Sequence, residues 1–172
     1  MKFKDIMNNI KGHFNCPPEM KKVNDDMKCY VYEKDNEAKS VVDLEGLVLE
    51  TVDFNFQFDV RVPVVIKKCI IKAFLVNTGW FKKGLIIDSC IFLNDIEYQM
   101  GGHNEKEIAI TNNVFCGFFD FFDCHFENDV IVKSNNFIMG TNLMGNKGTG
   151  YYNSFENKII VENNLGKTDV DY

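Results

Sequence analysis

A short unit recurs through the last two-thirds of the chain: three apolar residues, two or three polar residues, and then one or two apolar residues. Its five copies read VVIKKCII from Val64, LIIDSCIF from Leu85, IAITNNVF from Ile108, VIVKSNNF from Val130 and IIVENNL from Ile159. The first four copies follow at a nearly constant interval, and the last follows after a distinctly longer one. A stretch from Leu47, LVLETVDF, is a candidate earlier copy at a shorter interval. Because no helical pattern lies between the copies, the repeat predicts a parallel β-solenoid in which each copy is one coil and coils stack about 4.8 Å apart.

The apolar triplets, the Asn-Asn turns and the coil length resemble those of right-handed parallel β-helix proteins, the superfamily of pectate lyases and related polysaccharide-active enzymes. The resemblance covers residues 45–166 of the chain. It implies an all-β fold, a right-handed parallel β-helix of about five to six coils. It implies little about function, because one fold carries many functions. A β-sandwich of similar short strands is the alternative, and in it the repeat would be coincidental.

Residues 1–40 are expected to form an N-terminal helical or extended cap segment on a β-helix domain of residues 41–172, as one compact unit without a linker. Apolar residues recur near the N-terminus at helical spacing, at Phe3, Ile6, Met7, Ile10 and Phe14. Pro17 and Pro18 then interrupt the pattern and can start a second short helix. Helices at this end would cover the open sheet edges of a solenoid.

Stacked coils turn the copies into columns. The first and third triplet positions are aliphatic in every copy, and they are expected to face the core because side chains alternate along a strand. The middle position should face outward, yet it is also apolar; this outer column consists of Val65, Ile86, Ala109, Ile131 and Ile160. An apolar outer column predicts a cover. The N-terminal helices are the preferred cover, and a second copy of the chain, giving a homodimer, is the alternative.

Two polar columns follow the triplets. One is expected to make tight turns, because asparagine accepts left-handed backbone angles and bonds to nearby backbone groups; it contains Cys69, Cys90, Asn113, Asn135 or Asn136, and Asn164. The two cysteines are expected to pack as small buried side chains. The other column places Lys67 over Asp88 and Lys133 over Glu162, which predicts sheet-stabilising charge pairs.

One carboxylate pair is a candidate catalytic site. Glu97 and Asp120 occupy the same position relative to the third triplet residue of their copies, so they are expected side by side on adjacent coils. Two such carboxylates can act as acid and nucleophile. Lyases of the superfamily that the chain resembles also use several calcium-binding acids and an arginine or lysine base. Arg61 is the only arginine and no acidic cluster repeats around it, so the sequence favours a protein that is not an enzyme.

Aromatic and loop residues are candidates for binding. Aromatic pairs between the copies, such as Phe118-Phe119 and Phe121-Phe122, are expected to place some rings in the core and leave others outside. The stretches 98–106 and 143–152 are the most loop-like parts of the repeat region and carry candidate binding residues. The candidate binding residues are Trp80, His103, Lys147, Tyr151 and Tyr152.

Histidine and cysteine pairs are sparse in the chain. The His13 and Cys16 pair and the Cys124 and His125 pair each lack the partner pair that a zinc site needs, so no metal or other cofactor is expected.

Composition narrows the function classes. A net charge of -6 disfavours direct binding to nucleic acids or anionic membranes. With six cysteines, no CxxC pair and no signal peptide, a cytoplasmic protein with reduced thiols is expected. The preferred hypothesis is a non-catalytic binding or inhibitor module whose partner is another protein, as in bacterial or phage immunity or anti-defence factors. The alternatives are a polysaccharide lyase or glycoside hydrolase that binds carbohydrate, and an acidic nucleic-acid mimic.

Overall fold

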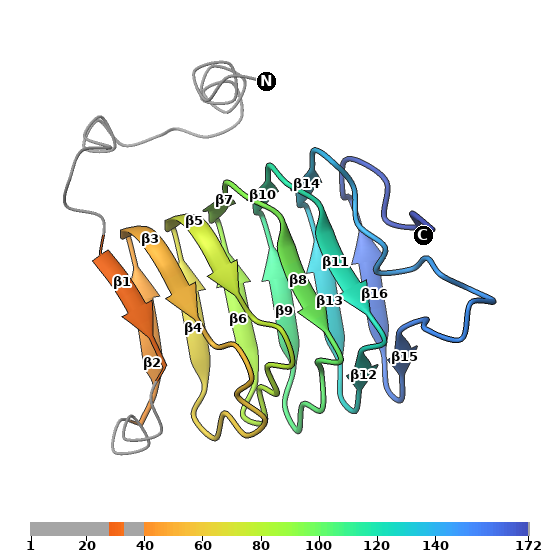
Figure 1. The fold of residues 1–172 in the computed structure, drawn as a ribbon, viewed down its shortest axis with the longest axis horizontal. Coiled ribbons are helices and arrows are strands. Elements are labelled where there is room, and N and C mark those ends of the chain that lie inside the picture. The colour runs from red at the N-terminus through yellow and green to blue at the C-terminus, as the bar shows by residue number, and fades with distance from the viewer. Residues whose placement is uncertain (1–27, 33–39, 172) are drawn as a thin grey trace.

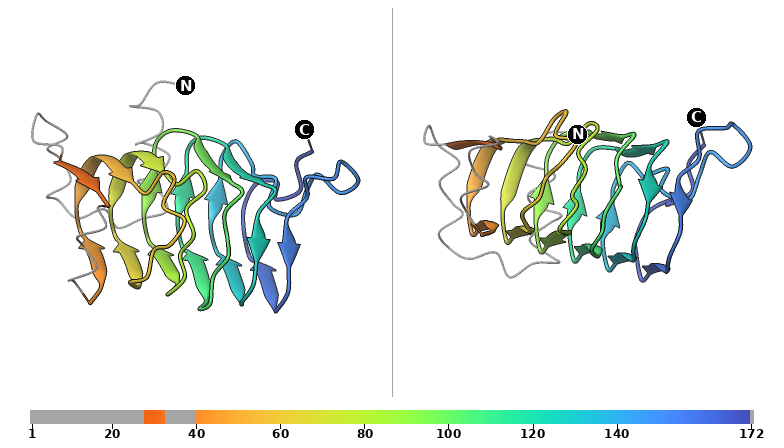
Figure 2. Two further views of the ribbon diagram at one scale, coloured as in Figure 1. Left: turned by 60° about the horizontal axis from the view of Figure 1, so that its bottom comes forward. Right: turned by 90° about the horizontal axis from the view of Figure 1, so that it is seen from below.

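The computed structural model describes residues 28–32 and 40–171, and their strands form a parallel β-solenoid of about five turns (Figure 1). Two further views show the coils stacked in one row from the N-terminal to the C-terminal end (Figure 2). Successive copies pair in parallel, as Val64 does with Leu85 and Val130 does with Ile159. The repeat is therefore a structural repeat, and the β-sandwich alternative is wrong.

One six-stranded sheet contains the apolar triplets. In spatial order its strands are β2 (Val42–Glu45), β4 (Val64–Lys67), β6 (Leu85–Asp88), β9 (Ile108–Thr111), β13 (Val130–Lys133) and β16 (Ile159–Glu162). The first and third residues of the inner copies, such as Ile66 and Val132, are buried in the core. In the last coil, Ile159 and Val161 are only partly buried. The predicted inward positions are therefore confirmed, with weaker burial at the C-terminal end.

A second six-stranded sheet adjoins the first, and each of its strands from β3 on follows a strand of the first sheet after a short turn. Its strands, in spatial order, are β1 (Lys28–Val31), β3 (Val48–Asp53), β5 (Ile70–Leu75), β7 (Ile91–Phe92), β10 (Val114–Phe115) and β14 (Asn136–Phe137). Two short pairs complete the coils, namely β8 (Ile96–Gln99) with β11 (Phe119–Phe122) and β12 (His125–Phe126) with β15 (Ser154–Phe155).

The first coil begins earlier than the sequence indicates. Val42 pairs with Val64 in β2 and β4, so the preceding copy is Val42–Glu45, one regular coil before Val64. The candidate copy from Leu47 is wrong, because Val48 lies in the second sheet and pairs with Ile70. Asp43 occupies the outward middle position of the true copy, so its triplet is not an apolar run.

The column of cysteines and asparagines forms a ladder inside the coil, at the corner after the first sheet. The backbone N–H of Cys90 donates to Oδ1 of Asn113 at 2.8 Å, and the N–H of Asn113 donates to Oδ1 of Asn135 at 3.0 Å. Asn135, not Asn136, is the ladder residue, and its N–H donates to Oδ1 of Asn164 at 2.9 Å. The ladder thus satisfies buried backbone groups at successive turns.

The left-handed backbone angle belongs to the residue before each ladder position. Ser89, Asn112, Ser134 and Asn163 have φ values of 57°, 57°, 56° and 56°. The prediction of a tight turn is confirmed. However, the ladder residues make hydrogen bonds between coils, and the residue that precedes each of them adopts the positive φ. Cys69 and Cys90 are buried free thiols, as expected.

Aromatic rings fill the core in stacks that run along the solenoid. Phe92, Phe115 and Phe137 stack at centroid separations of 5.0 Å and 4.9 Å, with interplanar angles of 11° and 6°. The aromatic pairs of the sequence divide between inside and outside: Phe119 is buried, and the adjacent Phe118 is partly exposed. These coils therefore contribute rings to one continuous core.

The outer column is confirmed in register and direction. Val65, Ile86, Ala109, Ile131 and Ile160 pair successively across the first sheet. Ile86 is 38% exposed and the other four are partly exposed. The helices expected to cover the column fall on residues outside the described part of the chain, and the described residues contain no helix. Docking of a second copy on this column stays a prediction.

The predicted register of the charged column is confirmed for both pairs, but the carboxylate of Asp88 is held mainly by hydrogen bonds. Lys133 pairs with Glu162, and their Nζ and Oε2 atoms lie 3.1 Å apart. Lys67 lies beside Asp88, whose carboxylate accepts hydrogen bonds from Thr111 at 2.7 Å and from a neighbouring asparagine at 2.8 Å. Burial raises the pKa of Asp88, but these hydrogen bonds outweigh it and hold the pKa below its ordinary value.

Candidate binding surface

Four ring side chains line up along one outer corner of the solenoid. We call Phe58, Trp80, His103 and His125 the ring strip. Their successive ring centroids lie 5.4, 4.2 and 5.4 Å apart. Parallel bridges join Trp80 to Gly102 and Gly102 to His125. Because His103 directly follows Gly102, the rings of Trp80, His103 and His125 lie on three consecutive coils. The strip therefore follows the solenoid axis, one ring to a coil.

The local backbone fixes the central rings of the strip. Gly102 has a φ of 91°, and a Cβ atom there would meet the carbonyl oxygen of His125 at 2.2 Å, so only glycine fits. His103 follows with a φ of 49°, and its ring packs beside that of Trp80. The indole Nε1 of Trp80 donates to the carbonyl of Met100 at 3.0 Å. The hydrogen bond of the Trp80 indole and the backbone turn at Gly102 therefore hold the rings of Trp80 and His103 in contact.

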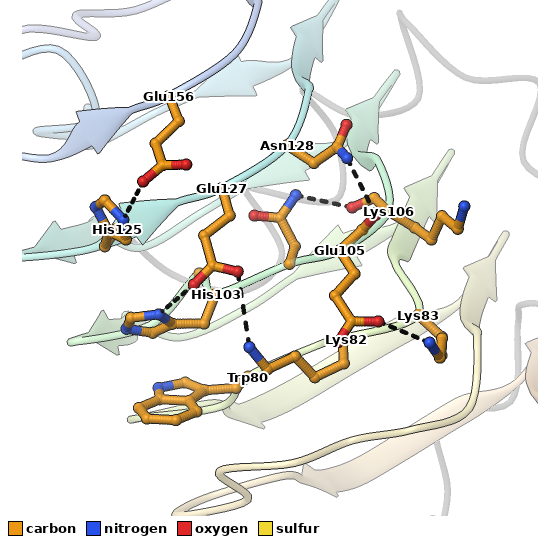
Figure 3. Close-up of polar contacts among 12 residues, drawn as sticks. Trp80, Lys82, Lys83, His103, Glu105, Lys106, His125, Glu127, Asn128 and Glu156 are labelled. Atoms are coloured by element: carbon orange, nitrogen blue, oxygen red, sulfur yellow. Dashed lines mark hydrogen bonds and ion pairs between the residues drawn. The ribbon is translucent and has the colours of Figure 1, made fainter.

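Acidic residues hold the two imidazoles (Figure 3). Nδ1 of His103 lies 2.9 Å from Oε1 of Glu127, and Nε2 of His125 lies 3.0 Å from Oε1 of Glu156. Nζ of Lys82 lies 3.7 Å from Oε2 of Glu127. The hydrogen bond to His103, with the nearby charge of Lys82, holds the pKa of Glu127 below its ordinary value. Glu127 thus ties the lysine of one coil to the histidine of the next.

A hollow of about 440 Å³ opens beside the N-terminal end of the ring strip. It is lined by Phe58, Asp59, Arg61, Trp80, Lys82, Lys83 and Glu105. Nε of Arg61 is 2.6 Å from Asp59, and Nζ of Lys83 is 2.7 Å from Glu105. Nζ of Lys82 lies 5.6 Å from the centroid of the Trp80 ring, a cation–π distance. The hollow combines two aromatic walls with several charged groups.

The carboxylate pair lies elsewhere on the solenoid. Glu97 and Asp120 are register partners in β8 and β11, as expected. Asp120 is 7% exposed and accepts hydrogen bonds from Gln99 at 2.9 Å and Asn142 at 2.6 Å, whereas Glu97 is exposed. Both line a hollow of about 380 Å³. The structure places the two residues side by side on adjacent coils, and it ties the carboxylate of Asp120 into a hydrogen-bond network.

The remaining predicted binding residues lie in a loop at the C-terminal end. Lys147, Tyr151 and Tyr152 are exposed there, and the ring of Tyr151 stacks on Phe122 at 4.9 Å. This loop accounts for the long interval between the last two copies, and the strands on both sides keep their register. The structure joins Trp80 and His103 in one surface, and it places these three residues in another.

Sequence reasoning missed half of the ring strip. Phe58, Trp80, His103 and His125 recur at the same interval as the apolar triplets of the regular coils. That spacing is the signal that could have found them, because residues one coil apart stack on each other. It is obscured by the many aromatics between the copies, which stand out first as local pairs. His125 stands out only beside Cys124, whose side chain is buried.

Comparison of the chain with protein-family models, with curated proteins and with solved structures finds no match. Among residues 28–32 and 40–171, no three His, Cys, Asp or Glu side chains are grouped so that they could hold a metal ion. The same residues include no helix with the length and apolar character needed to cross a membrane.

Proposed function

We propose that this protein is a non-catalytic binding or inhibitor module that engages another protein through the ring strip and the adjoining hollow. The observation that carries the proposal is the alignment of Phe58, Trp80, His103 and His125 along one outer corner. Phe58 is 53% exposed, and the nearby Met100 is 51% exposed. Rings held in this way offer a large contact area with little further loss of side-chain entropy on binding.

The residue types support a protein as the partner. Aromatic residues, methionine and arginine are the types enriched in the buried centres of protein interfaces, and tryptophan and arginine dominate binding energies there. Trp80 and the only arginine, Arg61, both line the hollow. Paired charges such as Lys83 and Glu105 lie beside them. An apolar centre with a polar rim is the usual arrangement of a protein–protein interface.

The test compares matched variants in quantitative affinity capture at physiological salt. We expect Phe58→Ala and Trp80→Ala to reduce capture of a stoichiometric partner at least about tenfold. Met139→Ala is the control, because Met139 is an exposed apolar residue (63%) outside the strip, and it should capture as the wild type does. Wild-type capture by both ring variants would overturn the proposal, as would the absence of any stoichiometric partner of the wild-type protein.

A carbohydrate-active enzyme of the right-handed, pectate-lyase-like kind is the second candidate. It is favoured by one observation, the register pairing of Glu97 with Asp120 beside a hollow. Activity on acidic or neutral polysaccharides with calcium present would support it if Glu97→Gln and Asp120→Asn abolish that activity. An acidic nucleic-acid mimic is disfavoured, because lysine–glutamate pairs such as Lys133 with Glu162 give the surface mixed charge.

A further inference from the structure

We infer that two copies of this chain form a symmetric dimer by pairing the outer edges of their β16 strands (Ile159–Glu162) in antiparallel register. Within the described part of the chain, β16 is the last strand of the first sheet, and no strand pairs with its outer edge (Figure 1). The hydrogen bonds of the C-terminal segment go elsewhere, because the N–H of Thr141 donates to the carbonyl of Lys167 at 2.9 Å. The edge of β16 is therefore a template for a further strand. This dimer goes beyond the proposed function and does not depend on it.

The last coil also leaves part of the apolar core uncovered. Val130 and Val132, in the strand before β16, are 1% and 0% exposed. Their register partners in β16, Ile159 and Val161, pack against the same core but are only partly buried. Burial of apolar surface favours association, so an apolar strand placed beside β16 would complete the burial of both residues.

The two ends of the first sheet differ in a way that favours a closed dimer over an open row of copies. The outward residue in the middle of β2 is Asp43, a charge of the kind that protects a sheet edge, whereas in β16 it is Ile160. If copies stacked head to tail in the register that joins the coils, Glu162 of one copy would lie beside Glu45 of the next. Like charges on neighbouring strands are destabilising. The edge of β16 therefore fits a second β16 better than it fits β2.

An antiparallel pair of β16 strands is complementary to itself. Opposite residues of an antiparallel pair point to the same face of the sheet, so a two-fold axis through Ile160 keeps every inward residue facing inward. Ile160 then lies opposite Ile160 of the second copy, and Ile159 lies opposite Val161. Lys158, just before the strand, lies opposite Glu162. Centring the axis on a neighbouring residue would place a charged side chain opposite Ile160 instead.

The charges at the edge fix this register. Lys158 is exposed and forms no ion pair with any residue of 28–32 or 40–171, and its N–H donates to Oδ1 of Asp129 at 3.3 Å. The side chain of Glu162 is 58% exposed and meets Lys133 on one side only, at 3.1 Å. Across the dimer, one row of side chains would read Lys133 and Glu162 of one copy, then Lys158 and Asp129 of the other. Alternating charge contributes more to register and specificity than to affinity.

Analytical ultracentrifugation of the full chain from about 1 µM to about 500 µM tests the dimer, because this range spans weak to moderate binding free energies. We expect the mass to rise from 19.9 kDa to twice that value and to stop there. Lys158→Glu and Glu162→Lys should each weaken the dimer at least about tenfold, because each places like charges opposite one another at both ends of the strand pair. An equimolar mixture of the two variants should associate as the wild type does, since opposite signs then meet at both ends.

Two controls separate this edge from other surfaces. Lys28→Glu changes an exposed lysine in β1, at the opposite end of the solenoid, and should dimerise as the wild type does. Ile86→Ser removes an exposed side chain from the middle of the outer column and should also leave the dimer unchanged, because the face of the sheet is not used. Circular dichroism melting curves confirm that each variant is folded.

A wild-type protein that stays monomeric throughout would overturn the inference, and so would species that grow beyond a dimer. A mixture that associates no better than either charge variant alone would overturn the antiparallel register. Loss of the dimer in Ile86→Ser, with Lys158→Glu unaffected, would place the second copy on the outer column instead. These outcomes are separate from the test of the proposed function, which depends on Phe58 and Trp80 and stands or falls without the dimer.

Discussion

At the scale of single residues, the inward asparagines join neighbouring coils through their side chains. Asn135 is 1% exposed, and its side chain accepts from the backbone N–H of Asn113 and donates to the carbonyl of Ile110 at 2.8 Å. The sequence predicted this column from the alignment of copies. It did not predict which residue turns left-handed, because serine, lysine and asparagine all occupy that position and share no side-chain pattern.

Asn135→Ala is expected to destabilise the fold by about 2–4 kcal/mol, because it leaves two buried backbone groups without their partners. Chemical denaturation measures the change in the free energy of unfolding. Asn128→Ala is the control: its side chain donates an exposed hydrogen bond to the Glu105 carbonyl, and its loss should be smaller. Equal losses in the two variants would show that the ladder contributes no more than a surface contact.

Acidification should remove the stabilisation that Glu127 provides. His103, Lys82 and His125 face this carboxylate and lower its folded-state pKa from the ordinary value of 4.5. A group with a lowered folded-state pKa stabilises the protein above its unfolded-state pKa, and the stabilisation disappears as pH falls through the folded-state value. The melting temperature of wild type should exceed that of Glu127→Gln near neutral pH and converge with it as the pH falls below 4.5. A constant difference across this range would contradict the assignment.

At the scale of strands and stacks, the sequence predicted more of the first sheet than of the other faces. The triplets mark β4, β6, β9, β13 and β16 directly, because aliphatic residues recur at fixed spacing. Short strands of the second sheet, such as β7 and β10, contain two residues each, too few for a periodic pattern. Phe92 stacks on Phe115 between these two strands, and only the coil register reveals that contact.

Phe115→Ala should cost about 3–5 kcal/mol of unfolding free energy, because the ring is 1% exposed and stacks on neighbours from both adjacent coils. Phe122→Ala is the control, since that ring is partly exposed and stacks on Tyr151 outside the core. Differential scanning calorimetry should show a much lower melting temperature for the first variant than for the second. Similar melting temperatures of the two variants would mean that the buried stack of Phe115 stabilises the fold no more than the surface stack of Phe122 on Tyr151 does.

At the scale of the whole molecule, the C-terminal segment binds back onto the last loop. The backbone N–H of Met144 donates to the carbonyl of Thr168 at 2.8 Å, and the N–H of Asn146 donates to Oδ1 of Asp171 at 2.6 Å. Sequence spacing predicted a long loop here, since the interval from Val130 to Ile159 exceeds the others. It did not predict the return of the chain, because residues 165–171 contain no repeat pattern to place them.

Gly145→Ala should separate the loop from this C-terminal segment. A Cβ atom at Gly145 would meet the carbonyl oxygen of Val170 at 2.0 Å, so one backbone must move. Chymotrypsin should then cleave faster at Tyr151 and Tyr152, as followed by mass spectrometry. Lys147→Ala, in the exposed part of the same loop, is the control and should be cleaved at the wild-type rate. Unchanged cleavage of Gly145→Ala would show that the backbone contact does not restrain the loop.

The loop also shows that one corner of a coil can hold extra residues while the strands on both sides keep their register. The chain returns to the regular coil at β15, where Phe126 stacks on Phe155 with ring centroids 5.1 Å apart and an interplanar angle of 7°. A foreign epitope inserted between Lys147 and Gly148 would be displayed on a scaffold whose coils keep their core contacts.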